Sequence, residues 1–68
     1  MMNREEVMAF IAANEGKRVR LTYTDGEVES VDISSVDEEG FVHSGPDGEN
    51  QDGFWTRFEY VSDAAPQL

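Results

Sequence analysis

The chain contains no cysteine, so disulfide bonds and zinc sites built on thiolates are excluded as sources of stability. A chain of 68 residues buries only about 60% of the surface that its unfolded form exposes. Such a core is marginally stable, and the seven aromatic residues (four Phe, two Tyr and one Trp) must supply much of it. Self-association is the other common route to stability at this size.

Long apolar runs and a basic leader are also missing. The longest apolar run is far shorter than the roughly 20 residues of a membrane-spanning helix. The first residues, MMNREEVMAF, lack the basic segment and following apolar segment of a signal peptide. We therefore expect a cytoplasmic protein with no membrane partner, which the absence of cysteine also fits.

Residue types that carry catalysis or bind metals are few. His43 is the only histidine, and no cysteine or G-x-S-x-G segment could complete a nucleophilic site with it. One histidine with carboxylates is a poor zinc ligand set. The acid-rich segment 47–53 lacks calcium-loop spacing, because Asp52 and Phe58 stand where an EF-hand has glycine and glutamate. We predict a non-enzymatic protein with no cofactor, no metal and a structural histidine.

Basic residues are scarce and unevenly placed. The chain has 15 acidic residues against 5 Lys and Arg, a formal net charge of -10, and no Lys or Arg between Asp25 and Asp52. This field repels phosphate backbones and favours basic partners. A solvated surface that keeps the protein soluble, or a salt-adapted source, explains the same charge more simply. An acidic mimic of DNA is a further interpretation, motivated by charge alone.

The N-terminal segment has the signals of one helix. Asn3 can accept a hydrogen bond from the amide of Glu6, whose side chain can reach back, as in a capping box. Gly16 provides a stop signal, so we predict a helix over residues 4–15. Its apolar residues share one face and should lie across a sheet: Val7, Phe10 and Ile11.

A β-hairpin follows the helix. The Asp25-Gly26 pair signals a two-residue turn, because both turn positions need positive φ. We therefore predict strands over residues 18–24 and 27–34. The first strand is apolar at alternate positions: Val19, Leu21 and Tyr23.

A two-residue turn leaves this hairpin out of register. It sets the polar Ser30 opposite Leu21, among core residues. One extra residue in the second strand would pair Leu21 with Val31 instead. We therefore predict a β-bulge at residues 29–30 that curls the sheet, although two short strands joined by a kink would bend it equally.

The remaining chain predicts two more strands, over residues 41–44 and 54–61, and a disordered tail over residues 62–68. Alternation places Phe54, Phe58 and Tyr60 on one face of the last strand. The fold class is therefore mainly β with one N-terminal helix, as a single domain over residues 1–68. We expect a small curled antiparallel sheet, or an SH3-like or Sm-like barrel, of four to five strands.

The segment VRLTYTDGEVESVDISSVD, residues 19–37, resembles the first three strands of an Sm-like or SH3-type small barrel, preceded by the helix that Sm-like proteins carry. Residues 5–61 are also similar to a WYL domain. The resemblance implies nucleic-acid binding, but this chain lacks most of the basic residues for it. It also has Val31 where Sm-like chains usually have glycine. The segments that carry the WYL likeness are Tyr23, Val31-Asp32-Ile33, Gly40-Phe41-Val42 and Arg57-Phe58-Glu59-Tyr60-Val61.

Two sets of residues are candidate binding sites. Trp55 and Arg57 should point outward together, which is the composition of a binding hot spot. Cover by the helix or by an oligomer neighbour is the preferred alternative. The second set is a basic stripe that could contact phosphate or, preferably, pair with acids across the hairpin: Lys17, Arg18 and Arg20.

These observations favour a small acidic binding module. It would bind a basic protein partner, or it would bind another copy of itself and form an oligomer. The first alternative is an Sm-like nucleic-acid binder that uses the two sets of residues above. The second is an acidic DNA-mimicking inhibitor.

Overall fold

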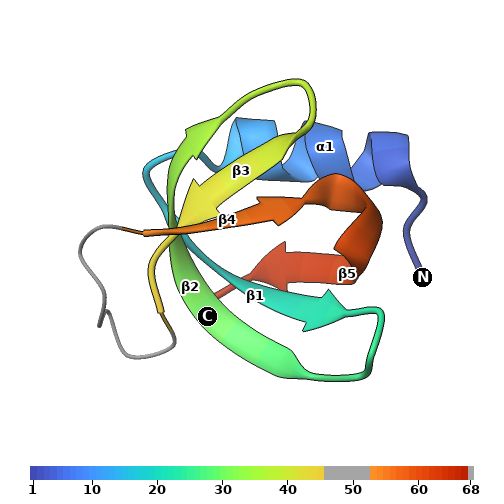
Figure 1. Ribbon diagram of the computed structural model, residues 1–68. Coiled ribbons are helices and arrows are strands. Elements are labelled where there is room, and N and C mark those ends of the chain that lie inside the picture. The colour runs from blue at the N-terminus through green and yellow to red at the C-terminus, as the bar shows by residue number, and fades with distance from the viewer. Residues whose placement is uncertain (46–52, 68) are drawn as a thin grey trace.

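The computed structural model of the protein describes residues 1–45 and 53–67. One helix lies across a curled sheet of five antiparallel strands in the order β4-β3-β2-β1-β5 (Figure 1). Within the described residues the edge strands β4 and β5 do not pair, so the sheet is curled but not closed. The predicted mainly β class is confirmed. The elements are α1 (Arg4–Ala13), β1 (Arg18–Tyr23), β2 (Val28–Val36), β3 (Gly40–His43), β4 (Phe54–Arg57), the 3-10 turn η1 (Phe58–Tyr60) and β5 (Val61–Pro66).

Helix α1 begins with the predicted capping box. The Glu6 amide donates to the Asn3 side chain at 2.8 Å, and the Asn3 amide donates to the Glu6 carboxylate at 2.9 Å. The helix ends at Ala13, two residues earlier than predicted, and the Asn14 side-chain amide donates to a carbonyl of its last turn. Within the described residues no helix is both long and apolar enough to span a bilayer.

The hairpin of β1 and β2 has no bulge at residues 29–30, so that prediction is wrong. The ladder pairs Leu21 with Glu29 and Val19 with Val31 without interruption. The physical reason is the turn, which has three residues instead of two. The Tyr23 amide donates to the Glu27 carbonyl at 2.8 Å, and the chain turns through Gly26 at φ 92°.

This longer turn explains the change in apolar parity along β2. Val28 pairs with Thr22 on the outer face and is 55% exposed, while Val31 and Ile33 face the core. Irregularities that bend the sheet lie elsewhere. The β2–β3 register shifts between Ile33 and Ser35, and the β1–β5 register shifts between Thr22 and Tyr23.

The C-terminal third corrects two further predictions. The chain does not continue as one strand through residues 54–61, because η1 interrupts it and turns it back as β5. The turn buries both Phe58 and Val61 and leaves Tyr60 exposed, so the predicted common face is broken. The tail is not disordered over residues 62–66, because these residues pair with β1 and gain the backbone hydrogen bonds of a strand. Leu68 lies outside the described residues.

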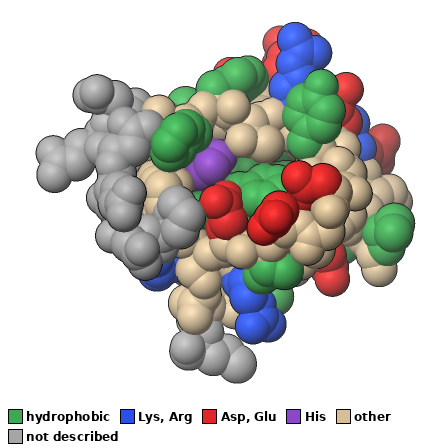
Figure 2. Space-filling view, turned by 60° about the horizontal axis from the view of Figure 1, so that its bottom comes forward, with side chains coloured by type: hydrophobic (Ala, Val, Ile, Leu, Met, Phe, Trp, Pro, Cys, Tyr) green, Lys and Arg blue, Asp and Glu red, His purple; other side chains and the backbone are tan. Residues whose placement is uncertain are grey.

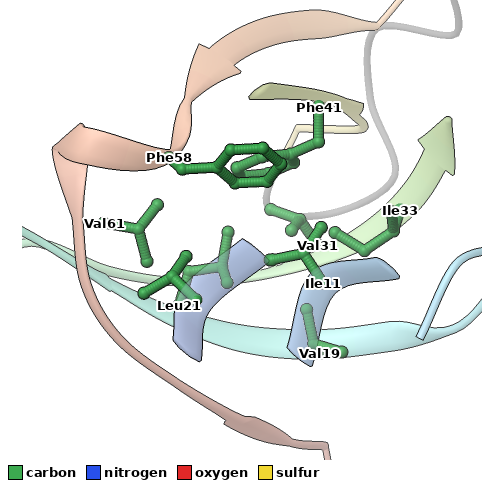
Figure 3. Close-up of a cluster of buried hydrophobic side chains, with 9 residues drawn as sticks. Ile11, Val19, Leu21, Val31, Ile33, Phe41, Phe58 and Val61 are labelled. Atoms are coloured by element: carbon green, nitrogen blue, oxygen red, sulfur yellow. The ribbon is translucent and has the colours of Figure 1, made fainter. Parts of the chain in front are cut away.

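The core fills the space between the curled sheet and the helix (Figure 3). The rings of Phe41 and Phe58 stack with their centroids 5.8 Å apart. Gly40 lets β3 and β4 approach closely, since a Cβ there would lie 2.2 Å from the carbonyl oxygen of Thr56. The buried apolar residues are Val7, Ile11, Val19, Leu21, Val31, Ile33, Phe41, Phe58 and Val61.

Candidate functional site

Trp55 and Arg57 lie on the outer face of the edge strand β4, where they pair with Val42 and Gly40 of β3. Trp55 is 49% exposed. Helix α1 packs against β5, η1 and β2, and it does not cover this tryptophan. The prediction that the helix covers Trp55 is therefore wrong. Cover by an oligomer neighbour stays a prediction.

The basic stripe of the first strand is partly paired across the hairpin. Nη1 of Arg18 lies 3.2 Å from Oδ1 of Asp32, its cross-strand neighbour, as the pairing interpretation predicted. Both side chains are more than one third exposed (37% and 54%), so the pair contributes at most about 1 kcal/mol. Arg20 lies opposite Ser30. In the sheet, two strands separate this stripe from Trp55 and Arg57, so the two predicted sets are not adjacent.

Sequence reasoning missed a pocket of about 280 Å³ at one end of the concave face of the sheet. Strand alternation explains most of it: inward-facing positions of β1 to β4 next to the core reach this end, and the outward-facing Trp55 borders it. Figure 2 shows the single histidine (purple) there, with hydrophobic side chains (green) and acidic side chains (red) close to it. The lining residues are Tyr23, Glu29, His43, Gly45, Phe54, Trp55 and Thr56.

His43 forms a fixed wall of the pocket. Its side chain is 4% exposed, and its ring centroid lies 5.1 Å from that of Phe41 and 5.9 Å from that of Phe54. Nδ1 lies 2.9 Å from the Ser44 carbonyl, which can only accept, so this nitrogen carries the proton. Nε2 lies 2.8 Å from the Thr56 hydroxyl, which donates to it when the ring is neutral. Both ring nitrogens are thus engaged, and the hydrogen bond between Nε2 and Thr56 ties β3 to β4.

Tyr23 brings a buried hydroxyl to the pocket. The oxygen has no hydrogen bond of standard geometry within the described residues, and the Glu29 carboxylate is near enough to act as an acceptor for its proton. Burial raises the pKa of the Tyr23 phenol above its ordinary value, and hydrogen bonding to Glu29 and the charges of Glu29 and Asp25 raise it further. The phenol is therefore protonated at neutral pH. With its proton directed to Glu29, the oxygen can still accept a hydrogen bond from a ligand.

Among the described residues, one side chain sets the charge of the pocket. Glu29 is the only Asp, Glu, Lys or Arg of residues 1–45 and 53–67 that lines it. The other described lining residues are aromatic or weakly polar, with Phe54 48% exposed at the edge. Ring faces and a carboxylate attract cations, and neither favours a phosphate. The sequence shows that Tyr23, Phe54 and Thr56 occupy alternating strand positions. It does not show that their side chains meet in one pocket, because this depends on how the sheet curls.

Comparison with known proteins gives no relationship: no family model matches the chain, and no curated protein or solved structure does either. Within residues 1–45 and 53–67 no three His, Asp or Glu side chains are grouped so that they could hold a metal ion. The acid-rich segment considered for calcium lies, apart from Gly53, outside the described residues.

Proposed function

We propose that the protein is a small non-enzymatic binding module that engages a basic segment of a partner protein at the pocket end of its curled sheet. The observation that carries this proposal is the adjacency of two half-exposed aromatic residues, Phe54 and Trp55, to a pocket whose only charged lining residue in the described part of the chain is Glu29. Exposed aromatic residues beside a recess are the usual anchors of protein interfaces.

The charge of the whole chain supports a basic partner. A net charge of -10 accelerates encounter with a cationic segment and disfavours acidic competitors. In Figure 2, acidic side chains (red) lie next to the hollow on the viewed face. The long-range field would bring the partner close, and the aromatic residues would provide contact area.

A titration of the full-length, isotope-labelled protein tests this function. The probes are two blocked twelve-residue peptides of Gly and Ser, one with four arginines and one with four glutamates. We expect the basic peptide alone to shift the amide resonances of residues 54–57, with an affinity that falls as salt rises. Equal shifts from both peptides, or none from the basic peptide, would contradict the proposal.

Self-association is a second candidate, favoured by the edge position of β4. The opposite edge strand is partly covered, because the Met2 amide donates to the Ser62 carbonyl of β5 at 2.9 Å. Strand β4 pairs with β3 alone among the described strands and carries exposed Phe54 and Trp55. Sedimentation at several protein concentrations tests this candidate: a constant monomer mass would exclude it.

Nucleic-acid binding, which the Sm-like and WYL resemblance implies, has less support. None of the described residues that line the pocket is basic, and Trp55 and Arg57 are not adjacent to Lys17, Arg18 and Arg20 in the sheet. The Sm-like relationship itself and the DNA-mimic alternative stay proposals without a supporting contact.

A further inference from the structure

We infer that the pocket formed by Tyr23, Glu29, His43, Phe54 and Thr56 receives a single arginine side chain of the basic partner. This inference rests on the proposed function and specifies its central contact. The pocket is large enough for one side chain, because its volume of about 280 Å³ is only just below the roughly 300–1,000 Å³ of sites for drug-sized ligands.

The charge of the occupant follows from Glu29. This side chain faces inward from β2 opposite the buried Leu21, and it is half-buried. A partly desolvated carboxylate attracts a cation more strongly than a fully solvated one does. The neighbouring Asp25 adds negative charge near Tyr23. An anionic group would meet repulsion from both carboxylates.

The rings around Glu29 select a flat and weakly hydrated cation. Tyr23 and Phe54 line the pocket with the fixed imidazole of His43, and Trp55 borders it from the edge strand. Guanidinium groups stack on aromatic faces and lose their hydration more easily than ammonium groups do. These properties favour arginine over lysine.

The hydroxyl oxygen of Tyr23 distinguishes arginine from a quaternary ammonium group. It accepts no hydrogen bond within the described residues, so a ligand N–H could donate to it while the O–H points to Glu29. A guanidinium group has five N–H donors, enough for both Tyr23 and the Glu29 carboxylate. A quaternary ammonium group has none, and it would leave the Tyr23 oxygen without a donor.

Small blocked ligands test the inference directly on the full-length protein. N-acetyl-arginine methylamide should give saturable shifts of the Tyr23, Glu29 and Phe54 amides and a change in Trp55 fluorescence. The matched citrulline derivative has the same shape without the charge and should bind at least about tenfold more weakly. The lysine derivative and tetramethylammonium should also bind more weakly. Equal binding of citrulline or tetramethylammonium, or no saturable effect of arginine, would overturn the inference.

Two conservative variants locate the contact. Glu29→Gln should weaken arginine binding about tenfold, and Tyr23→Phe about threefold to tenfold. Glu38→Gln is the matched control, because it removes one negative charge outside the pocket. Glu38 lies in the exposed turn before β3, whereas the pocket residue His43 lies at the other end of that strand. We expect Glu38→Gln to change the affinity less than twofold. Equal effects of Glu29→Gln and Glu38→Gln would show that only net charge matters and would overturn the assigned contact.

The same variants separate this inference from the proposed function. If the basic peptide binds the wild type and both pocket variants equally well, the binding module stands and the arginine pocket fails. If blocked arginine binds in the pocket but the basic peptide does not bind, the arginine site stands and the module function fails.

Discussion

Leu21 lies directly opposite Glu29 in the ladder between β1 and β2, and this pair marks the border between the core and the pocket. Leu21 is fully buried, whereas Glu29 retains access to solvent. Beyond this pair the inward side chains are polar or aromatic, and they line the recess. The three-residue turn creates this register, so the position of Glu29 depends on turn length.

Gly26→Ala should lower the free energy of unfolding by about 1 kcal/mol or more, because φ 92° is strained for any residue with a Cβ. Urea unfolding followed by Trp55 fluorescence measures the change. Thr24→Ala, in the same exposed turn, is the control and should change stability by less than about 0.5 kcal/mol. Equal stability of the Gly26→Ala protein and the wild type would mean that the turn is not the one described.

Gly40→Ala should be more damaging, for a different reason. The added Cβ would lie 2.2 Å from the Thr56 carbonyl oxygen and 2.8 Å from the Arg57 Cα, both rigid backbone atoms. Separating β3 from β4 should cost about 3 kcal/mol or more, which is a large part of the stability of a small domain. Calorimetry measures this loss. A melting temperature within two degrees of wild type would contradict the close approach of the strands.

Much of the architecture follows from local signals in the sequence. Patterns within a few residues were enough to predict three features. These are the capping box of Asn3 and Glu6, the alternating burial of Val19 and Leu21, and the mainly β class. The bulge at residues 29–30 was wrong because Asp25-Gly26 fits turns of two lengths, and each length gives a different register. Local sequence does not determine which length forms, since the choice depends on which register buries the core best.

The last strand and the pocket depended on contacts between distant parts of the chain. Nothing in the segment SDAAPQL indicates a strand, because its stability comes from pairing with β1 some forty residues earlier. The candidate residues Trp55 and Arg57 follow from simple alternation and are exposed as expected. The pocket brings together side chains from four strands, so it emerges only when the curl of the sheet is known.

Removal of residues 62–68 should therefore unfold the domain, although the sequence predicted that this tail is disordered. The deletion leaves β1 without its β5 neighbour and exposes the buried Val61 and Leu21. Circular dichroism of the shortened chain measures the outcome. Deletion of Leu68 alone is the control and should preserve the spectrum, while a folded chain ending at Val61 would contradict the role of β5.

Alkaline pH should destabilise the wild type more than the Tyr23→Phe variant. Burial raises the pKa of Tyr23 in the folded state, so the unfolded chain releases this proton first, near pH 10. The stability that the protonated Tyr23 contributes to the folded state is complete below that pH, and it is lost as the pH rises toward the raised pKa. Urea unfolding between pH 8 and about 11 measures the slope. Tyr60→Phe, at an exposed tyrosine, is the control and should leave the slope as in wild type; equal slopes for all three proteins would contradict the burial of the Tyr23 hydroxyl.

The central claim is that the end of the curled sheet is a receptor for an arginine side chain, and a paired nuclear magnetic resonance titration tests it most directly. Blocked arginine and blocked citrulline are added separately to the wild type and to Glu29→Gln. We expect blocked arginine to give saturable resonance shifts at Tyr23, Glu29 and Phe54 of the wild type. The other three combinations of ligand and protein should bind with an affinity at least about tenfold lower. Shifts that are absent, equal for both ligands or unchanged by Glu29→Gln would contradict the claim.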